Sequence, residues 1–318
     1  MALSLMLGTA GIAQENPAPR LVARIPLPGV SGRIDHLTVD TQRNRLFVAA
    51  LENGTVEIID IAQNKYLKRI EGVKDPQGLA FDEDHDILFV AEGGGHLDYV
   101  DGTWLTMRSR VANVPDADNV RLDKQRKAVW VAWGDGELEA FDLKSGSKVA
   151  EIKFGAHPES FRLDDKTNSI YVNLPDKGEI AVVDRKTLKI KARWHPPAGA
   201  NYPMFLHGNK VIIACRKPPC VIVYDAATGK LLQNLSTMKD CDDLFFDEEN
   251  KKLYASCGEG FVDVFAEQRD GSLKEERIVP SEPGARTSLF VPSLHRLYIA
   301  APKRGPRSSA ILVFDTKL

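Results

Sequence analysis

Short apolar segments recur along the chain at a nearly constant spacing. Each has at least three consecutive apolar residues rich in Val, Ile, Leu and aromatic side chains, and the next begins 41 to 44 residues later. The seven segments are residues 46–49, 88–91, 129–132, 170–173, 211–214, 253–256 and 297–300. Because every unit is built of β-formers, this is the period of a four-stranded propeller blade rather than of a helical repeat. The pattern predicts an all-β, seven-bladed β-propeller.

The other strands of each unit keep the same register. An inner strand that ends in Asp lies upstream, at residues 37–40, 79–82, 120–123, 161–164 and 244–247. A third strand that also closes on Asp lies downstream, at residues 58–60, 99–101, 140–142, 182–184, 223–225 and 313–315. An Asp at a strand end can accept hydrogen bonds from the following backbone and so begin the turn. A fourth, more charged strand, as at residues 66–70, suits an outer edge that discourages pairing with other chains.

The seventh unit lacks its fourth strand. The chain ends at Leu318, soon after the third strand at 313–315, and an unassigned strand-like segment at 21–25 precedes the first unit. The N-terminal strand therefore completes the last blade and closes the ring, which leaves no open sheet end. One propeller domain then accounts for residues 20–318.

Composition and the N-terminal segment bear on location. The chain is 43% hydrophobic and 27% charged with a net charge of -2, so it has no global attraction to nucleic acid or anionic membrane. No apolar run is long enough for a membrane span. Residues 1–13 resemble the apolar end of a secretory signal peptide without its basic region. We therefore expect a periplasmic or secreted protein, the alternative being a cytosolic protein with a frayed N-terminus.

The four cysteines favour export as well. Cys215 and Cys220 flank a hairpin loop, and Cys241 and Cys257 occupy neighbouring strands of blade six. Both pairs are geometrically plausible disulfides, which form in oxidising compartments. A metal site and four buried free thiols are the alternatives, although the spacings match no standard zinc pattern.

Several repeat motifs resemble those of a known family. Residues 170–173 and 178–184, with His157 and Pro158 opening the blade, are similar to the repeat of the YVTN/YncE-like seven-bladed propellers, and residues 75–81 and 88–91 match it again. The resemblance covers residues 20–318 and is carried by blade-building residues. It implies the fold and export from a bacterial cell, and it implies no particular chemistry.

Function in a propeller belongs to the loops around the mouth of the central channel. Alignment of the repeats gives the residue that each blade offers at the start of its inner strand: Asp35, Gln77, Asp118, Glu159, Met204, Asp242 and Thr287. Four carboxylates that converge on one axis are not required for folding, and their repulsion raises their proton affinity unless a cation or donors lie among them. The next residues inward, His36, Asn119, Ser160 and Asp243, add polar atoms.

Three interpretations of this mouth compete. The channel can hold only water, with its carboxylates solvated. Alternatively Asp35, Asp118, Glu159 and Asp242 hold a divalent cation such as Ca²⁺, for which oxygen ligands are suited. In the third interpretation that metal is catalytic, as in lactonase-like propellers, where an ion polarises a carbonyl. His36, beside Asp35, is the histidine best placed to join as a ligand.

Basic and aromatic loop residues surround the predicted mouth. Trp133, Arg216, Lys303 and Arg304 are expected on the same face as the acids, where they could bind an anionic partner or simply be solvated. The sequence thus favours an exported binding or scaffold module whose acidic mouth and rim take a small molecule, peptide or protein. The alternative is a metal-dependent hydrolase or lyase at the same mouth.

Overall fold

The described part of the chain consists almost entirely of β-strands. The structure is a computed structural model that describes residues 19–134 and 136–317. Blades 1 to 3 contain β2 (Leu37–Asp40), β3 (Arg45–Ala50), β4 (Thr55–Asp60), β5 (Lys65–Ile70), β6 (Pro76–Asp82), β7 (Ile87–Glu92), β8 (His96–Asp101), β9 (Met107–Ala112), β10 (Val120–Asp123), β11 (Ala128–Trp133), β12 (Glu137–Asp142) and β13 (Lys148–Lys153).

The remaining four blades follow the same order. They contain β14 (Phe161–Asp164), β15 (Ser169–Leu174), β16 (Glu179–Asp184), β17 (Lys189–Trp194), β18 (Gly199–His207), β19 (Lys210–Lys217), β20 (Pro219–Asp225), β21 (Leu231–Ser236), β22 (Cys241–Asp247), β23 (Lys252–Cys257), β24 (Phe261–Glu267), β25 (Leu273–Pro280), β26 (Ser288–Val291), β27 (Arg296–Ala301), β28 (Ala310–Asp315) and β1 (Arg20–Pro26). Short 3₁₀ turns are η1 (Leu51–Asn53), η2 (Pro175–Lys177) and η3 (Pro292–Leu294).

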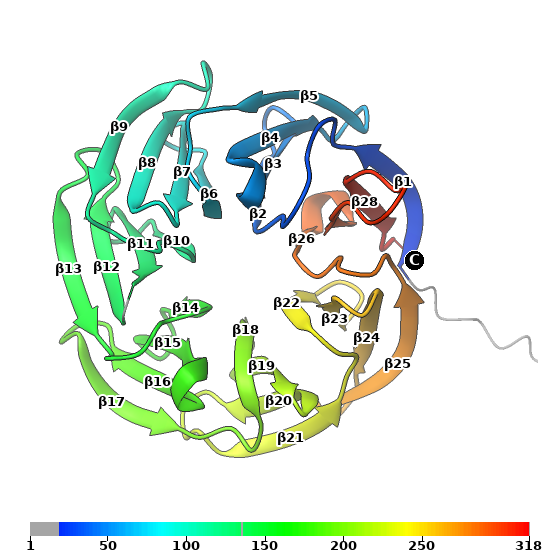
Figure 1. Cartoon of the computed structure of the whole chain (residues 1–318). Coiled ribbons are helices and arrows are strands. Elements are labelled where there is room, and N and C mark those ends of the chain that lie inside the picture. The colour runs from blue at the N-terminus through cyan, green and yellow to red at the C-terminus, as the bar shows by residue number, and fades with distance from the viewer. Residues whose placement is uncertain (1–18, 135, 318) are drawn as a thin grey trace, which may run out of the picture.

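Seven antiparallel four-stranded sheets form a ring, which confirms the predicted seven-bladed propeller. Figure 1 shows the first strand of each blade nearest the centre and the fourth strand on the perimeter. In the part of the chain described here, no helix is long and apolar enough to cross a membrane. The segment 1–13 lies outside the described residues, so its interpretation as a signal peptide stays a prediction.

The N-terminal strand closes the ring as expected. β1 pairs antiparallel with β28, from Arg20 opposite Asp315 to Pro26 opposite Ala310. Ile25 of β1 is 1% exposed and packs in a cluster shared by blades 7 and 1. β1, here called the clasp, therefore supplies both the outer strand of blade 7 and part of the core between blades 7 and 1.

The hydrophobic core is divided among the seven interfaces between neighbouring blades. Between blades 1 and 2, for example, the rings of Phe47 and Phe81 stack with centroids 5.6 Å apart. Between blades 4 and 5, Trp194 packs against both Tyr171 and Tyr224. Because each blade buries its faces only against its neighbours, removal of one outer strand weakens the whole ring.

The turns and edges follow the sequence pattern. Asp60, at the end of β4, accepts hydrogen bonds from the backbone N–H groups of Ala62 and Gln63, both at 2.9 Å. The outer strands are mostly exposed and charged, as β9 with Arg108 and Arg110 illustrates. The acidic strand ends therefore begin turns, and the charged strands occupy the perimeter as predicted.

The register brings the cysteines into opposite pairs. Cys215 lies opposite Cys220 across β19 and β20, and Cys241 lies opposite Cys257 across β22 and β23. All four are buried free thiols. Contact with Cys220, together with burial, raises the pKa of Cys215. Directly opposed residues have Cα atoms about 4.5–5.5 Å apart, within the range for a disulfide, but no bond is formed, so the disulfides stay predictions.

We expect protein exported to an oxidising compartment to contain the bonds 215–220 and 241–257, each stabilising the fold by at most about 3 kcal/mol. Titration of free thiols under denaturing, non-reducing conditions should then find none. Cytosolic expression of the same chain in a reducing strain supplies the control, with four reactive thiols. Four thiols in the exported protein would contradict the pairing.

Candidate functional site

The mouth of the channel is formed by the residues that start the inner strands. In blades 1, 3 and 4 the backbone N–H of this residue donates to the second strand, as Asp118 N–H does to the Ala132 carbonyl at 2.9 Å. The same register defines one position per blade, here called the mouth tier: Asp35, Gln77, Asp118, Glu159, Tyr202, Asp242 and Arg286.

The register places two of the predicted mouth residues at other positions. Met204 lies opposite Ile213, a position equivalent to that of Leu37 opposite Val48, and it is buried between blades 4 and 5. The turn between β18 and β19 is two residues shorter than that of blade 1, since His207 pairs with Lys210 where Asp40 pairs with Arg45. Tyr202 takes its place in the mouth tier.

In blade 7 the alignment is off by one residue. Ser288 lies opposite Ile299, so Arg286 occupies the mouth tier and Thr287 the next position inward. Thr287 is 1% exposed, and its hydroxyl donates to the Ile34 carbonyl at 3.3 Å. It therefore joins blade 7 to the loop before blade 1.

Arginines neutralise one side of the mouth. Arg33 forms an ion pair with Asp35 at 2.8 Å, and Arg286 forms one with Asp242 at 2.8 Å. Arg216 also pairs with Asp242, and its guanidinium lies 4.2 Å from the centroid of the Tyr202 ring. Two of the four predicted carboxylates are thus engaged by cations of the chain itself.

The other two carboxylates form no ion pair with an arginine or lysine of the described residues. Asp118 is 7% exposed, and its Oδ1 is buried without a hydrogen-bond partner. Burial, together with the charge of Glu159, raises the pKa of Asp118 to about 7. Burial, together with the charges of Asp242 and Asp35, raises the pKa of Glu159 to about 7 as well. A cation between these two groups would relieve the repulsion.

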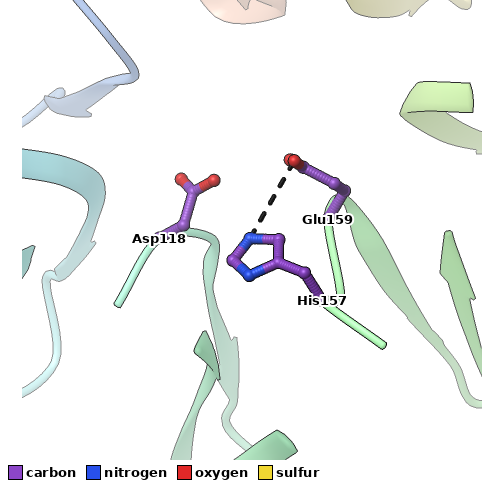
Figure 2. Close-up of side chains that lie close together, drawn as sticks. All are labelled: Asp118, His157 and Glu159. Carbon is purple, nitrogen blue, oxygen red and sulfur yellow. Dashed lines mark ion pairs between the residues drawn. The ribbon is translucent and has the colours of Figure 1, made fainter. Parts of the chain in front are cut away.

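His157 lies on the same side of the mouth as Asp118 and Glu159. One ligand atom each from Asp118, His157 and Glu159 lies within 4.8 Å of the other two. Figure 2 shows the imidazole between the two carboxyl groups, with its Nε2 3.9 Å from Glu159 Oε1. Its Nδ1 lies 2.8 Å from the Gly134 carbonyl oxygen, which can only accept. In the neutral imidazole Nδ1 therefore carries the proton and Nε2 presents a lone pair, as in metal-binding histidines.

A second tier of polar residues lies just inside. His36 Nε2 is 3.9 Å from Asp35 and 3.8 Å from Asp118, and its Nδ1 is 4.0 Å from Asp243. Burial lowers the pKa of His36, but these carboxylates outweigh it and the pKa is raised. Asn119 and Ser160 lie at the equivalent position of blades 3 and 4, where their carbonyls accept from the second strands. His36 thus lies among three carboxylates, which favour its protonated form.

The remaining predicted residues lie around this site in different roles. Gln77 donates to Asp116 Oδ1 at 3.2 Å and to the Ala117 carbonyl at 3.3 Å, so it ties blade 2 to the loop of blade 3. Trp133 lines a hollow of about 730 Å³ together with His157 and Asp116. Lys303 and Arg304 are exposed on the loop between β27 and β28.

Sequence reasoning missed Arg33, Arg286 and His157 as mouth residues. All three precede an inner strand in an interblade loop, within two residues of Asp35, Thr287 and Glu159. The alignment considered one position per blade and the next one inward. Reading two positions upstream would have found these side chains. The cation site of four carboxylates stays a prediction. Of those four residues, only Asp118 and Glu159 form a cluster of possible metal ligands, and His157 is its third member.

Comparisons with known proteins identify the class of fold. No protein-family model matches the chain, and no curated protein matches it. A chain in the solved structure described as "Crystal Structure of Mitotic Checkpoint Complex" is similar, with a TM-score of 0.80, 13% sequence identity, and coverage of 98% of this chain and 97% of that one. At this identity the similarity shows the fold alone. The chain is a seven-bladed β-propeller, and the YVTN/YncE-like family stays a prediction.

Proposed function

We propose that the protein is a binding propeller that takes a divalent cation at the channel mouth, where Asp118, His157 and Glu159 supply the ligands. The observation that carries the proposal is the buried, unbonded Oδ1 of Asp118 in a cluster of three ligand atoms within 4.8 Å of one another. The fixed tautomer of His157 adds support. Ligands from two blades leave the channel side of the ion open to a further ligand.

The donor set indicates which ions are suited. Two carboxylates suit Ca²⁺, Mg²⁺ and Mn²⁺, whereas an imidazole suits Zn²⁺ and other first-row metals. The histidine therefore favours Mn²⁺ or Zn²⁺ over the Ca²⁺ expected from four carboxylates. Within this proposal the protein is exported, belongs with the YVTN/YncE-like propellers, and uses the cation to recruit a small molecule or a peptide.

A scaffold role for the surrounding rim is part of the same proposal. Lys303 and Arg304 are exposed beside the mouth, and Trp133 lines the adjacent hollow. The similar fold in the mitotic checkpoint complex belongs to a protein assembly. These features support docking of an acidic peptide or protein segment at the rim.

The same cluster favours a second candidate function. Three protein ligands are the number found in catalytic metal sites, which keep a position for water or substrate. A metal-dependent hydrolase or lyase would use this position. Hydrolysis of simple lactones and esters by the metal-loaded protein, abolished in Asp118→Asn, would support this candidate over pure binding.

We expect Mn²⁺ to raise the melting temperature of the wild-type protein, because an ion that binds only the folded state stabilises it by about 2.7 kcal/mol at 100 times its dissociation constant. The double variant Asp118→Asn/Glu159→Gln should lose this response. The matched control Glu71→Gln/Glu249→Gln removes two exposed carboxylates from loops and should keep it. An equal response in all three proteins, or none in wild type, would reject the proposal.

A further inference from the structure

Deeper in the channel a third ring of side chains, here called the inner tier, has an unusual composition. It comprises one residue from the inner strand of each blade: Thr38, Ala80, Arg121, Arg162, Phe205, Phe245 and Leu289. These residues line a cavity of about 350 Å³. The wall combines apolar side chains with polar groups that include His36, Asp243 and Ser288, and two adjacent blades place an arginine in it.

The two arginines have few partners. Arg121 donates to the Val120 carbonyl at 2.7 Å and to Asn119 Oδ1 at 3.2 Å. Arg162 donates to the Phe161 carbonyl at 3.2 Å. Among the residues that the structure describes, no carboxylate forms an ion pair with either guanidinium. A guanidinium carries five N–H donors, so most donors of this pair have no acceptor in the chain.

A third arginine, Arg185, differs from these two because carboxylates pair with its guanidinium. Arg185 is buried, whereas Arg121 and Arg162 are half-buried, and its guanidinium pairs with Asp123 at 2.6 Å and also with Asp165. Burial lowers the pKa of Arg162, and the charge of Arg121 lowers it further. Two like charges that face one cavity repel each other, and packing alone does not require them.

The charge of one acid, Asp243, acts on both arginines, but among the described residues it forms no ion pair with either. Asp243 lines the same cavity, but its Oδ2 accepts the Ser288 backbone N–H at 2.7 Å and lies 4.0 Å from His36. It therefore belongs to the second tier. Both guanidinium groups lie near aromatic rings, Arg162 at 5.8 Å from the centroid of the Phe205 ring and Arg121 at 5.6 Å from that of Phe161.

We propose that this cavity binds a small organic carboxylate, with its two oxygens between Arg121 and Arg162 and its hydrocarbon body against Phe205, Phe245 and Leu289. The planar fork of a guanidinium matches a carboxylate, and two forks from adjacent blades can hold both oxygens. The volume is that of a small-molecule site, and the apolar wall selects an organic body over a hydrated inorganic ion. The site shares no residue with the cation cluster and has the opposite charge, although the charge of Asp118 acts on Arg121.

Calorimetric titration with 3-phenylpropionate, its neutral amide and inorganic phosphate tests the proposal. We expect saturable binding of the carboxylate only. Arg121→Met and Arg162→Met should each weaken that binding at least about tenfold, because each removes charge-assisted hydrogen bonds. The control Arg269→Gln removes an exposed arginine of a turn and should bind as wild type does. Neither methionine variant should melt lower than wild type without ligand.

Three results would overturn the proposal. The first is wild-type protein that does not bind 3-phenylpropionate saturably, or that binds its amide equally well. The second is unchanged affinity in both methionine variants. The third is binding of phosphate in place of the carboxylate, which would make the pair a phosphate site. The comparison of carboxylate with amide needs only wild-type protein, so it decides the matter even if a variant fails to fold.

Discussion

Deletion of residues 1–26 is expected to destabilise the whole propeller cooperatively. The deletion removes β1, exposes the edge of β28 and takes Ile25 out of the core between blades 7 and 1. Loss of this buried area alone lowers the free energy of unfolding by more than about 3 kcal/mol. Thermal unfolding followed by circular dichroism measures the effect as one transition at a lower temperature.

Matched variants isolate the clasp from the length of the chain. Ile25→Ala should destabilise by about 2–5 kcal/mol, because the side chain is 1% exposed. Leu21→Ala in the same strand should change stability by less than about 0.5 kcal/mol, since Leu21 is 50% exposed. A deletion of residues 1–14, which leaves β1 intact, should be silent. If the longer truncation melts with the full chain, β1 does not close the ring.

The second large effect is a dependence of stability on pH at the mouth. The pKa of Asp118 is raised from 3.8 to about 7 and that of Glu159 from 4.5 to about 7. A carboxyl group with a raised pKa stabilises the folded state below its unfolded pKa, and this stability is lost as pH rises through the folded value. Without divalent ions, Asp118→Asn/Glu159→Gln should therefore gain stability relative to wild type between about pH 4 and 7, by up to about 4 kcal/mol for each group.

The measurement is urea unfolding of both proteins at a series of pH values in the presence of a chelator. The difference in the free energy of unfolding should rise with pH and then level off. The Glu71→Gln/Glu249→Gln protein should show a nearly constant difference from wild type, because those carboxylates are exposed. If the difference in the free energy of unfolding between Asp118→Asn/Glu159→Gln and wild type also stayed constant with pH, the two acids would be solvated.

The architecture could be predicted from the sequence because each strand carries its own signal. The inner strand Leu37–Asp40 and its repeats were located by alternation and a terminal Asp, and the missing outer strand of blade 7 identified β1 as its replacement. The mistakes at Met204 and Thr287 have different causes. In blade 5 the turn between the first two strands is two residues shorter than in blade 1, which moves Met204 out of the mouth tier. Blade 7 keeps the spacing of blade 1, so there the alignment itself was one residue off.

The chemistry of the mouth was only partly predictable. The four carboxylates were found by alignment, but which of them have partners depends on arginines that reach across blades. Arg216 of blade 5 and Arg286 of blade 7 both contact Asp242 of blade 6. His157 was interpreted as a repeat residue because it precedes Pro158, whereas its contact with Gly134 aims its Nε2 into the mouth. Contacts between blades of this kind are visible only in three dimensions.

The central claim is that Asp118, His157 and Glu159 form a cation site, and anomalous diffraction from crystals grown with Mn²⁺ tests it most directly. The account predicts an anomalous peak within coordination distance of all three side chains, and its loss in Asp118→Asn/Glu159→Gln crystals. A second acidic group, Glu137, Glu139 and Glu151 on the outer strands of blade 3, serves as an internal control, because Lys148 and Lys153 already neutralise it. Peaks at that group alone, or no peak at the mouth, would contradict the claim.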